Sequence, residues 1–296
     1  MMKNIIAIDL GKTKIASALI SNEKLSCRNE IKTDIDRGGE FIIEQVLNEI
    51  DRILKFSNTQ IDGIGIGTSG VVDSYNKTIL SSGSIPNWNN INVGKIIDDK
   101  FNLPLMIDND VYVGALGEHY YGNDIKGKIA IYFTISTGVG LAIISNNKII
   151  HGAHNLSGQI AHLFIDEENT LNDVFSGKGI ENQGKIKIGT NIKTKDVFFL
   201  AKNGNENAQF IIDNAAKKAG FLISFIQNIL DPDYYILDGS VALKNKFFVD
   251  LIQIYAKKYL SNYSQYYPND LKLINASLGN NSVLYGCSAL WSEYEK

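Results

Sequence analysis

Apolar and polar positions along this chain follow two periods. Short apolar runs that end in Gly, Asn or Asp predict buried strands. The clearest of these runs are 4–9, 61–66 and 234–237. Two longer stretches, 39–56 and 207–230, carry apolar residues at helical spacing, and the second must stop at Asp231 because Pro232 cannot continue a helix. Strands that alternate with helices in this way predict an α/β fold.

The remaining elements follow the same order in each half of the chain. In the first half we expect strands at 4–9, 14–20, 25–32, 61–66 and 105–107, and helices at 39–56, 91–100 and 111–121. In the second half we expect a hairpin over 129–149, strands at 234–237 and 271–275, and helices at 207–230, 244–260 and 281–294. The polar segment 150–190 shows little regular pattern, so we expect irregular structure there.

An internal repeat relates the two halves. Residues 5–25 align without a gap onto residues 129–149, and 7 of the 21 positions are identical. Each copy reads as an apolar strand, a tight turn of Gly, Thr and small polar residues, and a second strand. The repeat predicts two similar domains whose Gly/Thr turns face each other across an interdomain cleft. Because free backbone N–H groups in such turns bind anions, we expect a nucleotide polyphosphate there.

Composition narrows the class of protein. With 44% hydrophobic and 21% charged residues, the chain has the balance of an ordinary soluble globular protein. The net charge of −3, without a basic stripe, argues against nucleic-acid binding. We find no signal peptide and no apolar run long enough to span a membrane. Cys27 and Cys287 are too far apart in sequence to suggest a disulfide framework or a zinc cluster, so a cytoplasmic location is expected.

The segment Asp9-Leu10-Gly11-Lys12-Thr13 follows the first strand. A carboxylate at a strand end, followed by a tight Gly/Thr turn, suits a magnesium–phosphate site. The alternative is a plain hairpin turn, in which Asp is common. The matching turn at 136–140 favours the phosphate site.

Asp108-Asn109-Asp110 lies between a strand and a helix. Asn and Asp cap helices well, but a cap requires only one of them. The second interpretation makes Asp110 a general base that accepts the proton of an attacking sugar hydroxyl. The residues alone leave both interpretations open.

Three further segments have a structural and a functional interpretation. His162, in the segment 157–162, is read first as a structural histidine. A metal site shared with His151 and His154 fits no familiar zinc spacing. Pro86-Asn87-Trp88 is read as Trp packing or, through Asn87, as a sugar contact. Asp238-Gly239-Ser240 fits an ordinary β–α turn or a loop against a nucleotide.

Together these segments resemble the ROK family of bacterial sugar kinases and repressors, within the actin/hexokinase-like ATPase superfamily. The resemblance runs from Ile5 to about Ala289. The segments that carry it are 9–15, 67–73, 86–88, 109–110 with 115–118, 137–140, 196–198 with 201–204, 231–233 and 239–242.

The resemblance implies an ATP-dependent kinase that phosphorylates the 6-hydroxyl of a glucose-type hexose, with Asp110 as the catalytic base. It implies a two-domain, ribonuclease H-like α/β fold, a cytoplasmic homodimer, and ATP with Mg²⁺ as cofactors. The implied sugar-binding residues are Gly70, Asn87, Asn109, Asp110, Gln159 and His162. The implied ATP-binding residues are Asp9, Gly11, Lys12, Thr13, Lys14, Thr137, Gly138, Gly140, Gly239 and Ser240, with Asp9 also holding Mg²⁺ directly or through water. We expect domains at 1–115 and 116–296, with the last helix, 281–296, packed back on the first.

The chain departs from the family pattern at three motif positions. Lys12 and Ser136 replace glycines, and Gln159 replaces a sugar-binding glutamate. The cysteines of the family's zinc loop are missing from 167–180, so no zinc is expected. These departures keep open an N-acetylmannosamine or other N-acetylhexosamine kinase and a catalytically weak sugar-binding regulatory protein. A DNA-binding repressor is disfavoured by the charge and by a first strand that begins by Asn4.

Overall fold

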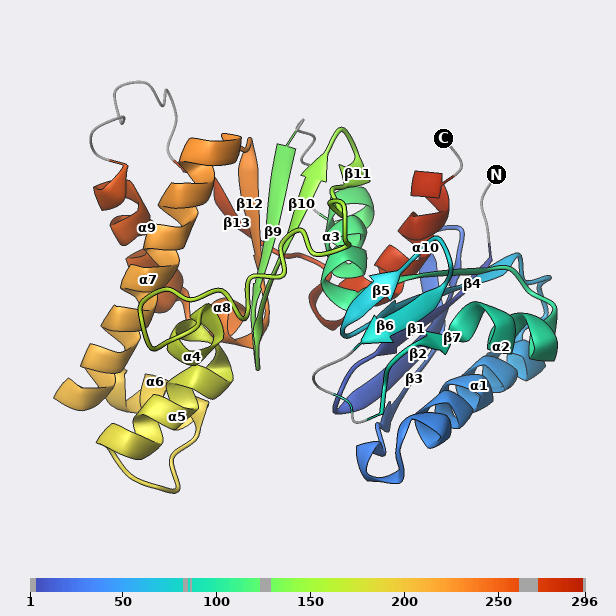
Figure 1. Cartoon of the computed structure of the whole chain (residues 1–296), viewed down its shortest axis with the longest axis horizontal. Helices are drawn as coiled ribbons and strands as arrows, with labels where there is room; N and C mark the ends of the chain where they lie inside the picture. The colour runs from blue at the N-terminus through green and yellow to red at the C-terminus, as the bar shows by residue number, and fades with distance from the viewer. Residues whose placement is uncertain (1–3, 82–84, 86, 123–128, 261–270, 295–296) are drawn as a thin grey trace. The chain divides into compact units, whose positions relative to one another are not determined.

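The computed structural model describes residues 4–81, 85, 87–122, 129–260 and 271–294 (Figure 1). The chain forms two compact units. The first comprises Met1–Lys126, Asn147–Ser157 and Ser277–Lys296, and the second comprises Gly127–Asn146 and Gly158–Ala276. Both units combine a sheet with helices, so the predicted α/β class is confirmed. None of the described helices is long and apolar enough to cross a membrane.

The sheet of the first unit has the strand order β3-β2-β1-β4-β8. Its strands are β1 (Ile5–Leu10), β2 (Lys14–Ser21), β3 (Lys24–Lys32), β4 (Gly63–Thr68) and β8 (Leu105–Asn109). β1 runs antiparallel to β2 but parallel to β4, and β4 runs parallel to β8. The carboxyl ends of β1, β4 and β8 therefore meet at one edge, where open α/β sheets bind ligands.

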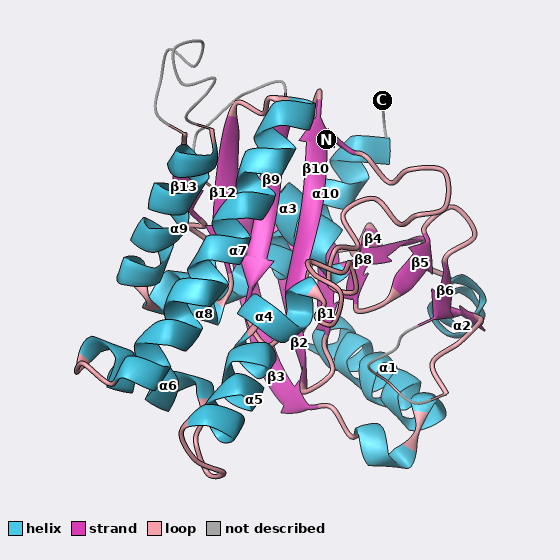
Figure 2. Cartoon of the chain, turned by 60° about the vertical axis from the view of Figure 1, so that its left-hand side comes forward, coloured by secondary structure: helices cyan, strands magenta, loops and turns pink. Residues whose placement is uncertain are grey.

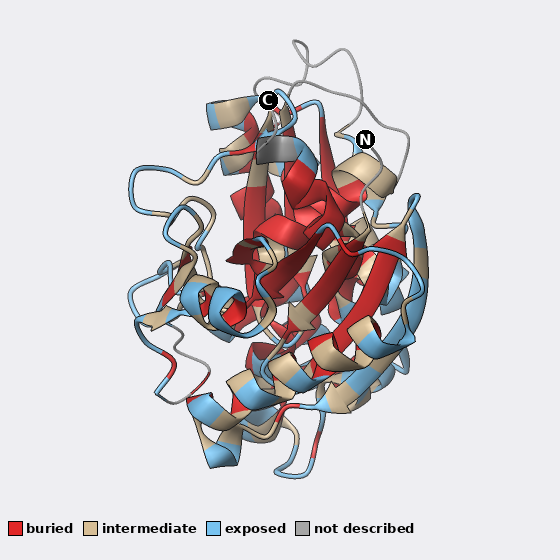
Figure 3. Ribbon diagram, turned by 90° about the vertical axis from the view of Figure 1, so that its right-hand side faces the viewer, coloured by how far each residue is buried: buried red, intermediate tan, exposed pale blue. Residues whose placement is uncertain are grey.

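Helices cover both faces of this sheet. They are α1 (Gly39–Phe56), α2 (Val93–Phe101), α3 (Asp110–Tyr121) and α10 (Ser282–Tyr294), with 3₁₀ turns at Ile35–Arg37 and Gly279–Asn281. A small separate sheet has the order β5-β6-β7, with β5 (Val71–Asp73), β6 (Thr78–Ser81) and β7 (Ile91–Asn92). Isoleucines of β1 and β4 pack with the apolar stripe of α1 in one core. In Figure 3 the strands are coloured mainly as buried.

Strand β4 has the sequence Gly-Ile-Gly-Ile-Gly-Thr, which puts isoleucines on one face and glycines on the other. The glycine face lies against α10. A Cβ on Gly65 would stand 2.4 Å from the carbonyl oxygen of Cys287, and one on Gly67 would stand 2.5 Å from Cγ1 of Val283. Any side chain at these positions would push the helix off the sheet.

The second unit contains β9 (Ile129–Ile135), β10 (Val139–Ser145), β12 (Tyr234–Asp238) and β13 (Leu273–Asn275), in the order β10-β9-β12-β13. β11 (Lys148–Ile149) follows β10 in the chain. The helices are α4 (Leu171–Phe175), α5 (Gly177–Lys187), α6 (Thr194–Lys202), α7 (Glu206–Leu230), α8 (Ser240–Lys244) and α9 (Lys246–Tyr259). Figure 2 shows α7 running alongside α9 over this sheet.

The internal repeat reappears as two hairpins of the same build. β1 pairs with β2 and β9 pairs with β10, both antiparallel. Each second strand ends in a turn whose two central residues have positive φ, Asn22 and Glu23 in one copy and Asn146 and Asn147 in the other. Two consecutive positive φ values are typical of the type I′ turn that joins tightly paired strands.

Residues 150–170 form turns, as expected, but the expectation of irregular structure is wrong from residue 171 onward, where α4 and α5 lie, and α6 was also not expected. Apolar periodicity is weak in α5, which has three buried glycines. Capping stabilises these helices instead: Thr170 and Asp173 form a capping box on α4, and Ser176 caps α5.

Two predicted helix boundaries also move. The helix expected at 91–100 begins only at Val93, because the Asn92 side chain accepts from the backbone N–H of Lys95 and caps it. The helix expected at 244–260 is α9, which begins at Lys246, and the short α8 before it was not expected.

The division between the units differs from the expected boundary at 115/116, which falls inside α3. The whole of α3 belongs to the first unit, as does α10. Buried Glu118 explains this arrangement, since its carboxylate accepts from the N–H groups of Ser277 and Leu278, each at 2.8 Å, and from the hydroxyls of Ser277 and Ser282. Glu118 thus ties α3 to the point where the chain re-enters the first unit.

We expect Glu118→Gln to lower the free energy of unfolding by about 2–4 kcal/mol, because an amide turns two donor hydrogens toward groups that are themselves donors. Urea unfolding followed by circular dichroism measures the change. Glu44→Gln, at an exposed position of α1, is the control and should change stability little. Equal stability of the two variants would contradict the role given to Glu118.

Candidate functional site

Asp9 and Asp108 lie in register on two strands of the first unit's sheet, with β4 between them. Asp9 pairs in register with Gly67, and Gly67 pairs with Asp108, so Asp9 and Asp108 occupy equivalent positions on β1 and β8. Asp110 follows two residues later as the first residue of α3. Gly70 comes after β4 in a left-handed conformation with φ 109°. Four predicted site residues, Asp9, Gly70, Asn109 and Asp110, therefore come to the same edge of one sheet.

Asp108, Asn109 and Asp110, at the end of β8, make different hydrogen bonds. Asp108 is fully buried, and its Oδ1 accepts from the backbone N–H of Asn109 at 2.7 Å. Asn109 caps α3 by accepting from the N–H of Val111 at 3.0 Å, and its amide donates to the carbonyl of Gly70 at 2.8 Å. Asp110 accepts from the same Val111 N–H through Oδ1 alone. Because Asn109 supplies the cap, Asp110 is left for other chemistry.

Burial perturbs the two remaining acids. Burial raises the pKa of Asp110 to about 6, although the hydrogen bond from the Val111 N–H lowers this pKa in part. Burial also raises the pKa of Asp9 to about 7, with repulsion from Asp110 adding to the effect and attraction to Lys14 reducing it. Two nearby carboxylates with raised pKa values mark a site where a cation or a transferable proton is favoured.

A histidine that the sequence left unassigned supports this edge. Nε2 of His151 donates to Oδ2 of Asp108 at 2.6 Å, and the His151 ring packs edge-on against Tyr112 with centroids 5.2 Å apart. The hydroxyl of Tyr112 in turn donates to the carbonyl of Ser157. Within the described residues no three His, Cys, Asp or Glu side chains gather as metal ligands. His151 therefore acts as a structural partner of Asp108.

The first Gly/Thr turn is closed by its own backbone. The N–H of Gly11 donates to the carbonyl of Lys14 at 3.0 Å, and the Thr33 hydroxyl donates to the carbonyl of Gly11 at 2.8 Å. Lys12 and Thr13 are exposed at its tip. The Lys14 ammonium pairs with Glu30 of β3 at 3.0 Å, so in this structure it is engaged by a carboxylate.

The other predicted sugar-binding residues lie apart in sequence. Asn87 is exposed with φ 57°, beside the fully buried Trp88, which packs in the core of the first unit. Pro86 lies outside the described residues. Gln159 and His162 are exposed residues of the second unit.

A cavity of about 440 Å³ marks the second unit. Among the predicted ATP-binding residues it is lined by Thr137 and Ser240. The other lining residues are Ser136, Gly177, Lys178, Glu181, Thr194, Lys195, Phe198, Phe199, Lys202, Val241, Lys244 and Asn245. A larger cavity of about 550 Å³ in the first unit, next to α2, is lined by none of the predicted site residues.

The elements around this cavity are tightly joined. The N–H of Gly177 donates to the carbonyl of Ser136 at 2.7 Å, and that of Lys178 donates to Thr137 at 3.1 Å, so the start of α5 holds the second Gly/Thr turn. Gly239 has φ 91°, and a Cβ there would stand 2.3 Å from the carbonyl oxygen of Ile135. Only glycine permits the loop before α8 to pass so close to β9.

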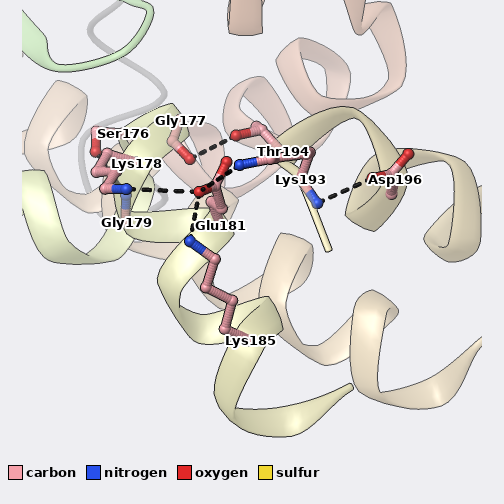
Figure 4. Close-up of polar contacts among 9 residues, drawn as sticks. All are labelled: Ser176, Gly177, Lys178, Gly179, Glu181, Lys185, Lys193, Thr194 and Asp196. Atoms are coloured by element: carbon pink, nitrogen blue, oxygen red, sulfur yellow. Dashed lines mark hydrogen bonds and ion pairs between the residues drawn. The ribbon is translucent and has the colours of Figure 1, made fainter. Parts of the chain in front are cut away.

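A lysine cluster joins α5 to α6 at the cavity wall (Figure 4). Oε1 of Glu181 is 2.6 Å from Lys185, 3.5 Å from Lys178 and 3.6 Å from Lys193. The hydrogen bond from Lys185 is the main reason that the pKa of Glu181 falls to about 2. Nearby, the Thr194 hydroxyl donates to the carbonyl of Gly177 at 2.7 Å.

Sequence reasoning missed the roles of Glu118, Lys178 and Glu181, and it considered His151 only as part of a metal site. Glu118 belongs to the motif segment 115–118, but the sequence does not indicate that it binds Ser277 and Leu278. The run Gly177-Lys178-Gly179 was a usable signal for Lys178, whereas nothing local in the sequence relates it to the turn at Thr137.

Comparison with known proteins relates the chain to a family. A family model described as the ROK family matches residues 5–294. An uncharacterized protein of Clostridium perfringens is 31% identical over 286 residues, which cover 94% of each chain. A glucokinase of Halalkalibacterium halodurans is 26% identical and covers 80% of each chain. A xylose repressor of Caldicellulosiruptor bescii is 26% identical over 97% of this chain and 77% of the repressor.

Solved structures agree on the fold. The ROK hexokinase of Thermus thermophilus has a TM-score of 0.86 at 23% identity, over 98% of this chain and 99% of that one. A ROK family glucokinase from Streptomyces griseus, solved in complex with glucose and AMPPNP, has a TM-score of 0.82 at 21% identity, over 97% and 98%. The hexokinase-like ATPase fold expected from the sequence is confirmed.

The raised pKa of Asp110 predicts a loss of stability whose size depends on pH. The folded state holds this proton more tightly than the unfolded chain, so stability falls as pH rises from the ordinary aspartate pKa of 3.8 to about 6, and it stays lower at all higher pH. We expect Asp110→Asn to raise the free energy of unfolding by about 1–2 kcal/mol at pH 8, allowing for solvent screening. The gain should fade toward pH 4.

Urea titrations at several pH values measure this effect. Asp99→Asn, at an exposed position of α2, is the matched control and should show no such pH-dependent gain. An Asp110→Asn variant that is destabilised equally at pH 4 and pH 8 would contradict the electrostatic account.

Proposed function

The chain belongs to the ROK family, and on that premise we propose that it transfers the γ-phosphoryl group of ATP to the 6-hydroxyl of a glucose-type hexose. The motif-based resemblance is thereby confirmed at the level of the family, and the chain is similar to sugar kinases of known fold. The observation that carries the proposal is Asp110, a partly buried carboxylate at a strand end whose helix is capped by its neighbour Asn109.

In the proposed reaction Asp110 accepts the proton of the attacking hydroxyl. A general base works best when its pKa lies near the working pH, and a pKa of about 6 leaves Asp110 ionised at neutral pH. The transition state of phosphoryl transfer is loose, so most of the catalysis comes from positioning and charge neutralisation. Asn109 and Gly70, joined by a hydrogen bond, would orient the sugar together with Asn87, Gln159 and His162.

The donor side of the reaction is assigned to the two turns and to Asp9. Asp9 fits a magnesium site because it is a carboxylate at a strand end whose pKa burial raises to about 7, so that its ionised form would be stabilised by a nearby cation. Bound Mg²⁺ would be that cation. The Gly11–Lys14 segment and Thr137, Gly138 and Gly140 would hold the phosphates, and Gly239 and Ser240 would hold the adenosine. The nucleotide analogue bound by the Streptomyces glucokinase supports ATP as the donor.

A second candidate is a sugar-binding regulator with weak or no catalysis. Xylose repressors are similar to this chain at the same identity as glucokinase, and Lys12, Ser136 and Gln159 replace family residues. The net charge of −3 supports small molecules rather than nucleic acid as partners. Turnover separates a kinase from such a regulator.

We expect sugar-dependent ADP release with one member of a panel of hexoses and N-acetylhexosamines, the latter including N-acetylmannosamine. Asp110→Asn should lower kcat about 100- to 10,000-fold, because it removes the base while leaving the hydrogen bond from Val111. In the wild type kcat/KM should fall as pH drops below about 6. Asp99→Asn is the control. Near-normal turnover by Asp110→Asn would contradict the assignment of Asp110 as the general base.

We also propose a cytoplasmic homodimer, for which α7 offers a surface. Three large apolar side chains recur on it at intervals of four residues and are 46%, 56% and 61% exposed: Phe221, Phe225 and Ile229. Phe221 also packs edge-on against Tyr259 of α9, with ring centroids 5.5 Å apart. A face of this kind is typical of a surface covered by another chain.

Phe225→Glu should convert this dimer to a monomer, because the interface would then bury an unpaired charge. Light scattering coupled to gel filtration gives the mass of each species. Phe56→Glu, at a 71% exposed position on α1, should leave the mass of the wild type unchanged. A monomeric wild type would contradict the dimer.

A further inference from the structure

We propose that Lys178 is a phosphate-binding residue, whose ammonium group moves from Glu181 to the polyphosphate of a nucleotide bound against the Ser136–Gly138 turn. The inference rests on the proposed use of ATP and adds a residue that the family motifs did not identify. Lys178 lines the 440 Å³ cavity together with Thr137 and Ser240.

The backbone holds Lys178 beside the turn. Its N–H donates to the carbonyl of Thr137 at 3.1 Å, and the preceding N–H, of Gly177, donates to Ser136 at 2.7 Å. The next N–H groups, of Gly179 and Ile180, are used by Ser176. The first N–H groups of α5 are thus all engaged within the protein. Positive charge for a phosphate at this place must come from a side chain.

The turn itself carries no positive charge. Residues 136–140 read Ser-Thr-Gly-Val-Gly, and in the internal repeat Ser136 aligns with Lys12. The first copy of the device therefore has a lysine within its turn, and the second copy has serine at that position. Lys178 stands next to the second turn through its backbone hydrogen bond to Thr137. Lys178, from α5, can therefore supply beside the second turn the positive charge that its own sequence lacks.

The contact between Lys178 and Glu181 is suited to exchange. It is 3.5 Å long, and the Lys178 side chain is 55% exposed, so leaving Glu181 costs little. Lys185, at 2.6 Å, and Lys193, at 3.6 Å, stay on Glu181 and keep it neutralised. Neither Lys185 nor Lys193 lines the cavity. Figure 4 shows the three lysines converging on one carboxylate from separate positions.

Other lysines of the cavity wall are placed differently. Lys195, Lys202 and Lys244 lie on α6 and α8, and Lys202 sits over the ring of Phe247 at 5.0 Å from its centroid. For none of the three does the structure record a backbone bond to the Gly/Thr turn, within the described residues. Lys178 is therefore the lysine assigned to the phosphates.

The test compares three lysines that share Glu181. Calorimetric titration with Mg-ADP and with Mg-AMPPNP should show about 10- to 100-fold weaker binding for Lys178→Met, the loss typical of one charge-assisted hydrogen bond. Lys185→Met and Lys193→Met should bind both nucleotides as the wild type does. Lys178→Arg should restore most of the affinity, and adenosine, which has no phosphate, should bind all variants alike.

A rescue follows from the internal repeat. Ser136→Lys, which copies Lys12 into the second turn, should recover part of the nucleotide affinity lost in Lys178→Met. In turnover assays Lys178→Met should raise KM for ATP and leave KM for the sugar unchanged. Melting temperatures of all variants control for misfolding.

The outcomes separate this inference from the proposed function. If Lys178→Met binds Mg-ADP as well as Lys185→Met does, Lys178 is not a phosphate ligand, whatever the enzyme's activity. If the wild type binds nucleotide but phosphorylates no hexose, the proposed function fails while weaker binding by Lys178→Met still supports the inference. If the wild type binds neither nucleotide, both are overturned.

Discussion

The close contact between β4 and α10 is the constraint on which the first unit depends. Glycines at alternate positions of β4 remove every side chain from one face, and α10 comes so near that a methyl group at Gly65 would meet the backbone of Cys287. The isoleucines between them fill the opposite core. Because β4 is the central strand between β1 and β8, its position sets the register of Asp9 and Asp108 and hence the edge where the acids meet. Glu118 of α3 stabilises the same packing, because its carboxylate accepts hydrogen bonds from Ser277 and Leu278, just before α10.

At that edge, adjacent polar residues are kept chemically distinct by their partners. Asp108 is occupied by His151, and Asn109 caps α3 and reaches Gly70. Asp110 keeps an oxygen that takes no part in the cap. The same burial that raises the pKa values of Asp9 and Asp110 costs stability at neutral pH. A cation near these two carboxylates would favour their ionised forms and offset that cost.

The two copies of the repeat differ in the position of their positive charge: the first has Lys12 within its turn, and the second has Ser136 there. Their strands pair alike and end in the same positive-φ turn. The first turn carries Lys12 and accepts hydrogen bonds from Thr33, whereas the second accepts hydrogen bonds from the first N–H groups of α5, which places Lys178 beside it. Only the second turn adjoins the cavity formed with α6 and α8 in its unit.

The sequence by itself determined the α/β class, the repeat, most strands and the long helices, because each has a local period that burial imposes. It also located Asp9, Asn109 and Asp110 at strand ends. It did not reveal α4, α5 and α6, whose order rests on caps and on glycines packed against neighbours rather than on an apolar stripe. It likewise did not reveal that Asn109 caps α3, that Asp108 binds His151 and that Asp110 keeps an oxygen outside the cap. Only the tertiary structure decided those roles, since each depends on a partner such as His151, Gly70 or Thr137 that lies tens of residues away in the chain.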